Sequence, residues 1–424
     1  MKTAFYVATL VALASGIAAA DEVTDWNRIM LDALLVAPAP AAPLAERPAA
    51  IVMAAVFDAV NGIDRRYTPI HVSPDAPRGA SQRAAAVQAA YASLVHLFPS
   101  QSAALDQKRT ISLSDISSGV AAEHSESIER GIEWGQTVAD AIWVWRSTDG
   151  FSNAPPPFMG GLATGEWRPT PPAFAPGLAP QLGQMTPWAI ASPSQFRPAG
   201  PLDLASPQYA ADFNETETMG SATSSTRTID QTLYARFWQS ASPADFWDPV
   251  ATNLSAERHL TLSENARLLA LLNMGLADAV IGCWDAKYTY TFWRPVTAIP
   301  LAGSDGNPAT TADPTWTPLI VTPPFPEYPS AHSCVSGAAA RILAGYFGEE
   351  TQFSVSSDGM PGVVRYFSSF SSALDEVKNA RVFGGIHFRT SCNDGQTLGS
   401  AVGDYILGHA LLPIDGNREG QVQH

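Results

Sequence analysis

Apolar residues recur at helical spacing along most of the chain, and segments that alternate apolar and polar positions are scarce. Because side chains repeat about every 3.6 residues on a helix and about every 2 on a strand, this pattern favours helices. The clearest case begins at Thr261-Leu262-Ser263-Glu264, which fits a capping box, and continues through apolar positions to Val280. Similar patterns predict helices over Ala49–Ile63, Gln82–Leu97, Ser125–Arg146, about Ser333–Phe347, Ser372 to about Val382, and Gln396–Leu411. The sequence therefore predicts an all-α protein built as a helical bundle.

Residues 153–207 depart from this pattern, since prolines, glycines and aromatic residues cluster there, as in Ala154-Pro155-Pro156-Pro157. Proline interrupts long helices, and the many aromatic side chains argue against a free linker. We expect this segment to wrap over the bundle, where it can cover the entrance of a site. The chain then divides into an N-terminal helical region over 21–152, the wrapping segment over 153–207 and a C-terminal helical domain over 208–424.

The first twenty residues have the features of a secretory signal. Lys2 is the only charge, an apolar run extends from Ala4 to Ile17, and small residues end at Ala20. The run is short for a membrane span, so a signal peptide over 1–20 is favoured over an uncleaved anchor. We expect a secreted or periplasmic protein. Since Asn273 and Asp278 interrupt the most apolar later stretch, no membrane span is expected in the mature chain.

The composition narrows the possible partners. The 424 residues are 46% hydrophobic, as in a globular protein, and the formal net charge is -15. A strongly acidic protein repels phosphate backbones and anionic lipid heads, so nucleic acid and anionic membrane surfaces are unfavourable partners. Any anion site in this chain must be a local basic pocket.

Three short segments of the C-terminal half carry residue types that bind anions. The first contains Lys287 and Arg294, which are seven positions apart, about two helical turns, so both can point the same way. The second is Pro329-Ser330-Ala331-His332, which precedes a helix of small residues. There the Ser330 hydroxyl and the following backbone N–H groups can face an anion.

The third segment runs from Arg381 to His387 and contains Gly384-Gly385, where the backbone can approach closely. Taken singly, such residues are more often solvated charges, satisfied core histidines or ordinary helix caps. Together the three segments supply three fixed cations, a hydroxyl, a backbone donor and two imidazoles. This combination suits a tetrahedral, multiply charged oxyanion.

The three segments resemble the signature of the superfamily of vanadium haloperoxidases and type-2 phosphatidic acid phosphatases, and the chain is most similar to bacterial vanadium haloperoxidase-like proteins. That signature is a lysine followed after six residues by Arg-Pro, then Pro-Ser-Gly-His, then an arginine followed after five residues by a histidine. It matches at Lys287, Arg294-Pro295, Pro329-Ser330, His332, Arg381 and His387. The resemblance implies the helical-bundle fold of that superfamily.

Two positions depart from the signature. Ala331 replaces the glycine before the first histidine, which leaves the backbone N–H available if the local φ suits alanine. Ser391 occupies the position four residues after the last histidine, where the family often has an aspartate that orients the imidazole. Asp394 or a backbone carbonyl can take over that role, or the site is weaker.

A vanadium-dependent haloperoxidase, using hydrogen peroxide, a halide and a small organic acceptor, is the activity that the resemblance implies first. His387 would then ligate the vanadium of vanadate, His332 would be the general acid–base, and Lys287 would polarise bound peroxide. The oxo groups would be bound by Lys287, Arg294, Ser330, the Ala331 N–H and Arg381. Trp284 and Phe325 resemble aromatic members of the halide pocket in fungal-type chloroperoxidases, although core packing explains both positions equally well.

Two alternatives use the same pocket. In a soluble, exported acid phosphatase of the superfamily, phosphate replaces vanadate, His387 forms a phosphohistidine and His332 protonates the leaving alcohol. In a non-catalytic oxyanion-binding protein the pocket binds but does not turn over. The aromatic positions and the absence of several membrane spans favour the haloperoxidase.

Three cysteines, Cys283, Cys334 and Cys392, permit one disulfide in an exported chain. Cys334 follows His332 by two residues and Cys392 follows His387 by five. If the two histidines converge, a disulfide between Cys334 and Cys392 is expected, with Cys283 free.

Overall fold

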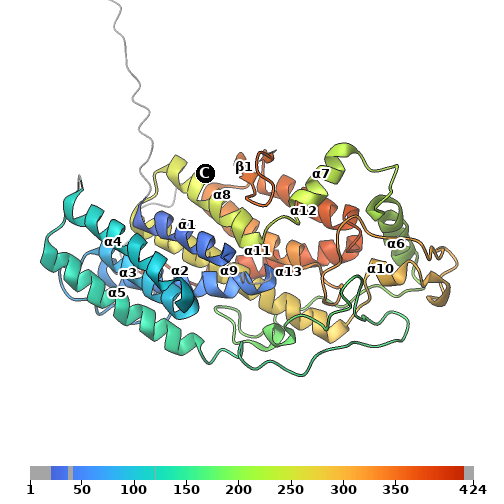
Figure 1. Cartoon of the computed structure of the whole chain (residues 1–424), viewed down its shortest axis with the longest axis horizontal. Coiled ribbons are helices and arrows are strands. Elements are labelled where there is room, and N and C mark those ends of the chain that lie inside the picture. The colour runs from blue at the N-terminus through green and yellow to red at the C-terminus, as the bar shows by residue number, and fades with distance from the viewer. Residues whose placement is uncertain (1–20, 37–41, 120, 415–424) are drawn as a thin grey trace, which may run out of the picture.

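The computed structural model describes residues 21–36, 42–119 and 121–414. It is 58% helical and contains thirteen α-helices and one two-stranded sheet, which confirms the predicted all-α class. Figure 1 shows α1–α5 at one end of the molecule and α6, α7 and α10 at the other. The predicted signal peptide lies outside the described residues.

The N-terminal helices pack through small residues. They are α1 (Glu22–Leu35), α2 (Ala42–Asp64), α3 (Gln82–Leu97), α4 (Ser102–Ser118) and α5 (Ser125–Arg146). A side chain at Gly131 or Gly135 of α5 would collide with backbone carbonyls of α3, so these two helices approach closely. The bounds of α3 and α5 agree with the sequence pattern. α1 and α4 were not predicted.

Eight helices follow in the C-terminal half. They are α6 (Pro207–Gly220), α7 (Ile229–Phe237), α8 (Pro243–Arg258), α9 (Leu262–Tyr290), α10 (Pro295–Ala298), α11 (Ala331–Phe347), α12 (Phe370–Phe383) and α13 (Arg389–His409). The capping box at Thr261 is formed, because its side chain accepts from the Glu264 N–H. Between α11 and α12 the antiparallel strands β1 (Phe353–Ser356) and β2 (Val364–Phe367) form a hairpin.

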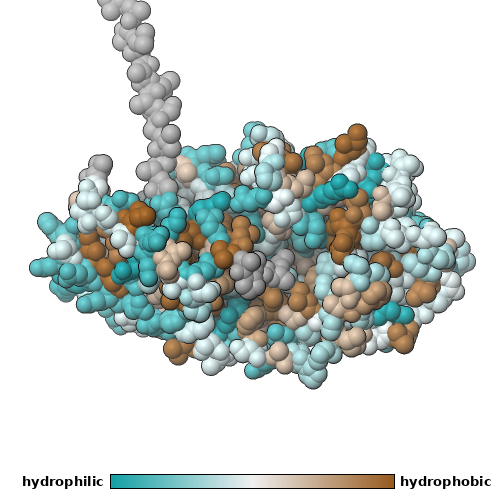
Figure 2. All heavy atoms as spheres, in the orientation of Figure 1, coloured by the Kyte–Doolittle hydropathy of each residue, from teal (hydrophilic) through white to brown (hydrophobic). Residues whose placement is uncertain are grey.

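α9 is the central helix and packs against α2, α8, α11 and α13. By length and composition it could cross a membrane, contrary to the expectation from Asn273 and Asp278, but 94% of its apolar window is buried inside the protein. On the face shown in Figure 2, apolar atoms form separate patches and no continuous band. α9 therefore has the surroundings of a core helix.

The predicted wrapping segment contains no α-helix before α6 begins at Pro207, and it packs along α9. Its one short 3₁₀ helix, Pro180–Gln184, packs on α9, where a side chain at Gly183 would collide with the α9 backbone. The buried carboxylate of Asp278 accepts three N–H groups, from Trp188, Ala189 and Ile190. Asp278 thus anchors the segment to the bundle and does not interrupt α9.

Candidate active site

The predicted site residues come from five places in the fold and meet at the end of α9. Lys287 lies in the last turn of α9, Arg294 precedes α10, and Ser330 precedes α11. Arg381 lies in the last turn of α12, and His387 lies between α12 and α13. Five side chains are almost fully buried: Lys287, Arg294, Ser330, Arg381 and His387. His332, on the first turn of α11, is partly buried as a residue, although its ring nitrogen Nε2 is inaccessible.

Lys287 and Arg294 do not share a helical face, so that expectation was wrong. α9 ends at Tyr290, and Thr291 takes the left-handed conformation, with φ 48° and ψ 38°. The chain turns there, and Arg294 lies beyond the helix. The two cations converge because both donate to carbonyls of the segment 325–329.

The ammonium of Lys287 is held by three backbone carbonyls. Its Nζ donates to Pro326 O at 2.9 Å, Glu327 O at 3.0 Å and Pro329 O at 2.5 Å. Burial lowers the pKa of Lys287 to about 8. The lysine is thus fixed in direction by the segment that also leads into Ser330.

Each of the two arginines of the site, Arg294 and Arg381, has one buried nitrogen without a partner among the described residues. Arg294 donates from Nε to Phe325 O and from Nη1 to Ile386 O, and its Nη2 is unpaired. Arg381 donates from Nη2 to the side chain of Gln239 at 2.8 Å, and its Nε is unpaired. Burial lowers the pKa of Arg294 to about 10 and that of Arg381 to about 9, so both remain charged near neutral pH. An external anion can bind the free donors.

Ser330 and Ala331 lie at the positive end of α11, which is 17 residues long. Ser330 is the N-cap, but its hydroxyl makes no capping bond and accepts from Ser333 Oγ at 3.2 Å. Ala331 is the first helical residue and is not among the residues with positive φ. Alanine therefore fits this position without strain, and its N–H belongs to the first turn of α11.

Gly384-Gly385 ends α12 as expected. Gly385 has a φ of +76°, and a side chain there would collide with the carbonyl of Gly220 on α6. This close approach lies at the turn between α12 and His387.

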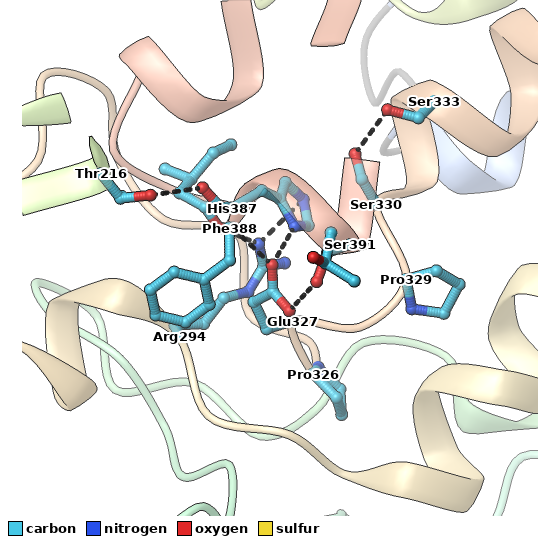
Figure 3. Close-up of polar contacts among 12 residues, drawn as sticks. Thr216, Arg294, Pro326, Glu327, Pro329, Ser330, Ser333, His387, Phe388 and Ser391 are labelled. Carbon is cyan, nitrogen blue, oxygen red and sulfur yellow. Dashed lines mark hydrogen bonds and ion pairs between the residues drawn. The ribbon is translucent and has the colours of Figure 1, made fainter. Parts of the chain in front are cut away.

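The imidazole of His387 is held between an arginine and a carboxylate (Figure 3). Its Nδ1 lies 2.9 Å from Glu327 Oε1, and its Nε2 lies 3.1 Å from Arg294 Nη1. Because an arginine can only donate, Nε2 carries a lone pair and Nδ1 carries the hydrogen. Burial, then the charge of Arg294, lowers the pKa of His387 well below its usual value. The ring is therefore neutral, with a basic nitrogen on the arginine side.

Glu327 is a site residue that the sequence analysis missed. Asp394, considered there as the partner of His387, accepts from the Tyr328 hydroxyl. Ser391, which replaces the family's aspartate, donates to Glu327 Oε2 at 2.5 Å. The available signal was a carboxylate three residues before Ser330 and two residues before the second segment.

His332 has a different partner. Its ring lies near the backbone carbonyl of Trp238, and its Nε2 is unpaired among the described residues. Burial and the charge of Arg381 lower the pKa of His332 well below its usual value. His332 is thus neutral, with a free Nε2, and the turn after α7 that holds it was not predicted.

The expected disulfide between Cys334 and Cys392 is not formed, since all three cysteines are buried free thiols. The Cys334 thiol lies against that of Cys283, on α9. The Cys392 thiol instead bonds to the hydroxyls of Ser330 and Ser333. Although the histidines converge, the two helices turn their cysteine side chains to different neighbours.

Trp284 and Phe325 form one aromatic wall beside Lys287. Their ring centroids are 5.0 Å apart, and the ammonium lies 5.1 Å from the Phe325 centroid and 5.9 Å from that of Trp284. The indole N–H donates to Leu178 O of the wrapping segment. Trp284 therefore offers this region its ring and not its N–H.

Comparison with known proteins agrees with this geometry. A family model described as the second helical-bundle domain of VCPO matches residues 267–416, which contain all three segments. The vanadium chloroperoxidase of Curvularia inaequalis is 32% identical over 102 residues, covering 22% of this chain and 16% of that protein. The chain is a relative of the vanadium haloperoxidases.

The whole fold of this haloperoxidase relative is shared with solved structures. A bacterial vanadium-dependent iodoperoxidase is 25% identical, with a TM-score of 0.77, over 91% of this chain and 95% of its own. A holo-type bacterial vanadium-dependent chloroperoxidase superimposes with a TM-score of 0.66 over 93% of both chains at 17% identity. The likeness therefore extends from the C-terminal bundle to the N-terminal helices.

Proposed function

We propose that the chain is a vanadium-dependent haloperoxidase that binds vanadate at His387 and oxidises halide with hydrogen peroxide. The observation that carries the proposal is the set of unpaired buried nitrogens around the His387 ring. Nη2 of Arg294 belongs to the guanidinium that touches His387 Nε2, and Nε of Arg381 is also free. Burying such charges without counter-ions is costly, so the pocket fits a multiply charged oxyanion.

The ligand chemistry also fits vanadate. His387 presents a neutral imidazole whose Nε2 lone pair faces the cations, and neutral imidazole is a common metal ligand. The Glu327 carboxylate accepts from the Nδ1–H group and so raises the basicity of Nε2. Bound vanadate would supply the Lewis acid at which peroxide is activated for halide oxidation. Arg294, Arg381, Ser330 and the Ala331 N–H would neutralise and orient its oxygens, and Lys287, whose three N–H groups already donate to carbonyls, would contribute its positive charge.

His332 has the properties of the proton-transfer group. Its free Nε2 can accept a proton from hydrogen peroxide and return it to a leaving oxygen. A carbonyl near the ring stabilises an imidazolium less than the carboxylate beside His387 does. The two histidines are therefore suited to different roles, with the more basic ring as ligand and His332 as acid–base.

The aromatic wall supports a halide as the second substrate. Trp284 and Phe325 offer a dry surface next to Lys287, and aromatic edges tolerate a soft, weakly hydrated anion. We expect Trp284→Ala to reduce bromide oxidation more than any hydrolysis of phosphate esters. Both rates are measured in the same variant, so a loss of folded protein lowers both. Equal losses would remove Trp284 from halide binding.

The test of the function is a pair of assays on the purified protein. Titration with orthovanadate, in the presence of peroxide and bromide, is expected to yield brominated organic acceptor, and a phosphate-ester assay without vanadate is run beside it. His387→Ala should abolish tight vanadate binding and both activities. Ester hydrolysis without halide oxidation would identify a phosphatase, and vanadate binding without turnover would identify a binding protein.

We also propose that the chain acts outside the cytoplasm, because residues 1–20 combine Lys2, an apolar run and terminal small residues. Amino-terminal sequencing of the protein from its native host is expected to begin at Asp21. Recovery of the full-length chain from the cytoplasm would contradict export.

A further inference from the structure

Glu327 accepts three hydrogen bonds from His387 and the residues just after it. Its Oε1 accepts from His387 Nδ1 and from the Phe388 N–H, both at 2.9 Å, and its Oε2 accepts from Ser391 Oγ. The side chain is fully buried. All three donors belong to the loop and first turn that carry His387, so one carboxylate holds this loop and the ring together.

The backbone of Glu327 is fixed just as firmly. Its N–H donates to Phe292 O at 2.9 Å, and its carbonyl accepts from Lys287 Nζ. The carboxylate therefore projects from a segment that the first cationic motif already holds. Glu327 therefore binds His387 through its side chain and Lys287 through its backbone carbonyl.

We propose that Glu327 is the positioning residue of this site, and that it fixes the Nδ1–H tautomer of His387 in place of the family's aspartate at position 391. The Glu327 carboxylate lies on the Nδ1 side of the ring, and Ser391, at the position of the family's aspartate, donates to its second oxygen. The inference rests on the proposed role of His387 as the residue that bonds the oxyanion centre.

A tautomer requirement explains why a carboxylate is needed at either position. Nε2 can bond to vanadium or phosphorus only if its lone pair is free, which places the hydrogen on Nδ1. An isolated neutral imidazole favours the opposite tautomer. Within the described residues, no second side chain contacts Nδ1. Removal of Glu327 is therefore expected to release the ring into a mixture of tautomers.

The test relocates the carboxylate. We compare wild type, Glu327→Gln, Glu327→Ala and the double variant Glu327→Ala/Ser391→Asp, with Asp394→Asn as a matched control for loss of a nearby carboxylate. The first readout is ¹⁵N NMR of labelled histidine in vanadate-free protein, with His387 assigned by the signal missing from His387→Ala. The second readout is the affinity for orthovanadate by calorimetry.

In wild type, His387 should be protonated at Nδ1. Glu327→Ala should lose this preference and bind vanadate about 10- to 100-fold more weakly, and the double variant should recover both to within a few-fold. Asp394→Asn should leave both readouts unchanged. If Glu327→Ala does not fold, Glu327→Gln conserves its size and should still weaken binding, since its amide nitrogen cannot accept from Ser391.

Three results would overturn the proposal. They are an unchanged tautomer in Glu327→Ala, a double variant as defective as that single variant, and a restored tautomer without restored affinity. The tautomer readout needs no vanadate. If wild type binds no oxyanion at all, the proposed function fails while the role of Glu327 is still decided by NMR.

Discussion

Two buried polar regions of this molecule carry opposite kinds of unpaired atom. In the active site the unpaired atoms are the nitrogens Arg294 Nη2, Arg381 Nε and His332 Nε2. In a cluster beneath α1, which we term the acidic cluster, they are oxygens. The acidic cluster consists of Asn27 on α1, Glu46 on α2, Asp248 on α8 and Asn273 on α9. Both regions are almost completely buried.

The two regions solve the problem of buried charge differently. Burial raises the pKa of Glu46 to about 8 and that of Asp248 to about 7, so these carboxyls become neutral by taking up protons. The guanidinium groups of Arg294 and Arg381 keep their protons near neutral pH, so these two arginines need an anion from outside. Among the described residues no group of three or more His, Cys, Asp or Glu is arranged to hold a metal. The comparison therefore predicts that an anion stabilises the candidate active site and that the acidic cluster needs no counter-ion.

The largest expected effect comes from His332. Of the three unpaired nitrogens named above, only its Nε2 can exchange a proton near neutral pH. His332→Ala should keep its vanadate affinity within a few-fold and lose about 10²- to 10⁴-fold in turnover. Calorimetry and steady-state bromide oxidation measure the two quantities. An equal loss of binding and turnover would mean that His332 is a ligand-binding residue like its neighbours.

Ligand-induced stabilisation tests the comparison directly. Orthovanadate or phosphate at a hundred times its Kd should stabilise the protein by about 2.7 kcal/mol, and this gain should disappear in His387→Ala for vanadate. Calcium and magnesium chloride at equal ionic strength should have no such effect. The acidic cluster would be a cation site after all if a divalent cation stabilised the protein against denaturation and Glu46→Gln removed that gain.

Loss of one pocket cation should weaken anion binding by a smaller factor. Arg294→Met removes a charged donor while keeping much of the volume, and vanadate affinity should fall by about 10- to 100-fold. Arg341→Met is the matched control, because the substitution removes the same charge from an exposed arginine of α11. This arginine pairs with Asp404. Similar losses in both variants would indicate a general charge effect instead of a built pocket.

The smallest effect concerns the acidic cluster and depends on pH. Burial raises the pKa of folded Glu46 to about 8, whereas the unfolded chain releases this proton near the ordinary glutamate pKa of 4.5. The folded state thus binds more protons across this window, and the free energy of unfolding should decrease as pH rises through it. Glu46→Gln cannot ionise, so its stability relative to wild type should rise by about 1.4 kcal/mol for each pH unit across the window.

Denaturant unfolding at both ends of the window measures this difference, with the exposed Glu129→Gln as control. Equal pH slopes for wild type and Glu46→Gln would show that Glu46 is already ionised in the folded state, and would remove the contrast between the two regions.

Much of the architecture followed from local signals. The capping box at Thr261 and the alanine-rich run ending at Leu97 predicted helix bounds that the structure confirms. α4 was missed because its residues show little apolar periodicity and only Leu105 and Ile116 are buried. The helix that begins at Arg389 was predicted from Gln396, because its first turns carry polar side chains.

By itself the sequence determined the helical class and singled out the residues that the structure gathers at the end of α9, since periodicity and motif spacing are local properties. It did not determine how those residues meet. Lys287 and Arg294 converge through a left-handed turn at Thr291, and Cys334 faces Cys283 in place of Cys392. The partner of His387 is Glu327, which lies 60 residues earlier in the chain. Only tertiary packing decides which distant groups share one buried volume, because a hydrogen bond depends on separation in space and not on separation along the chain.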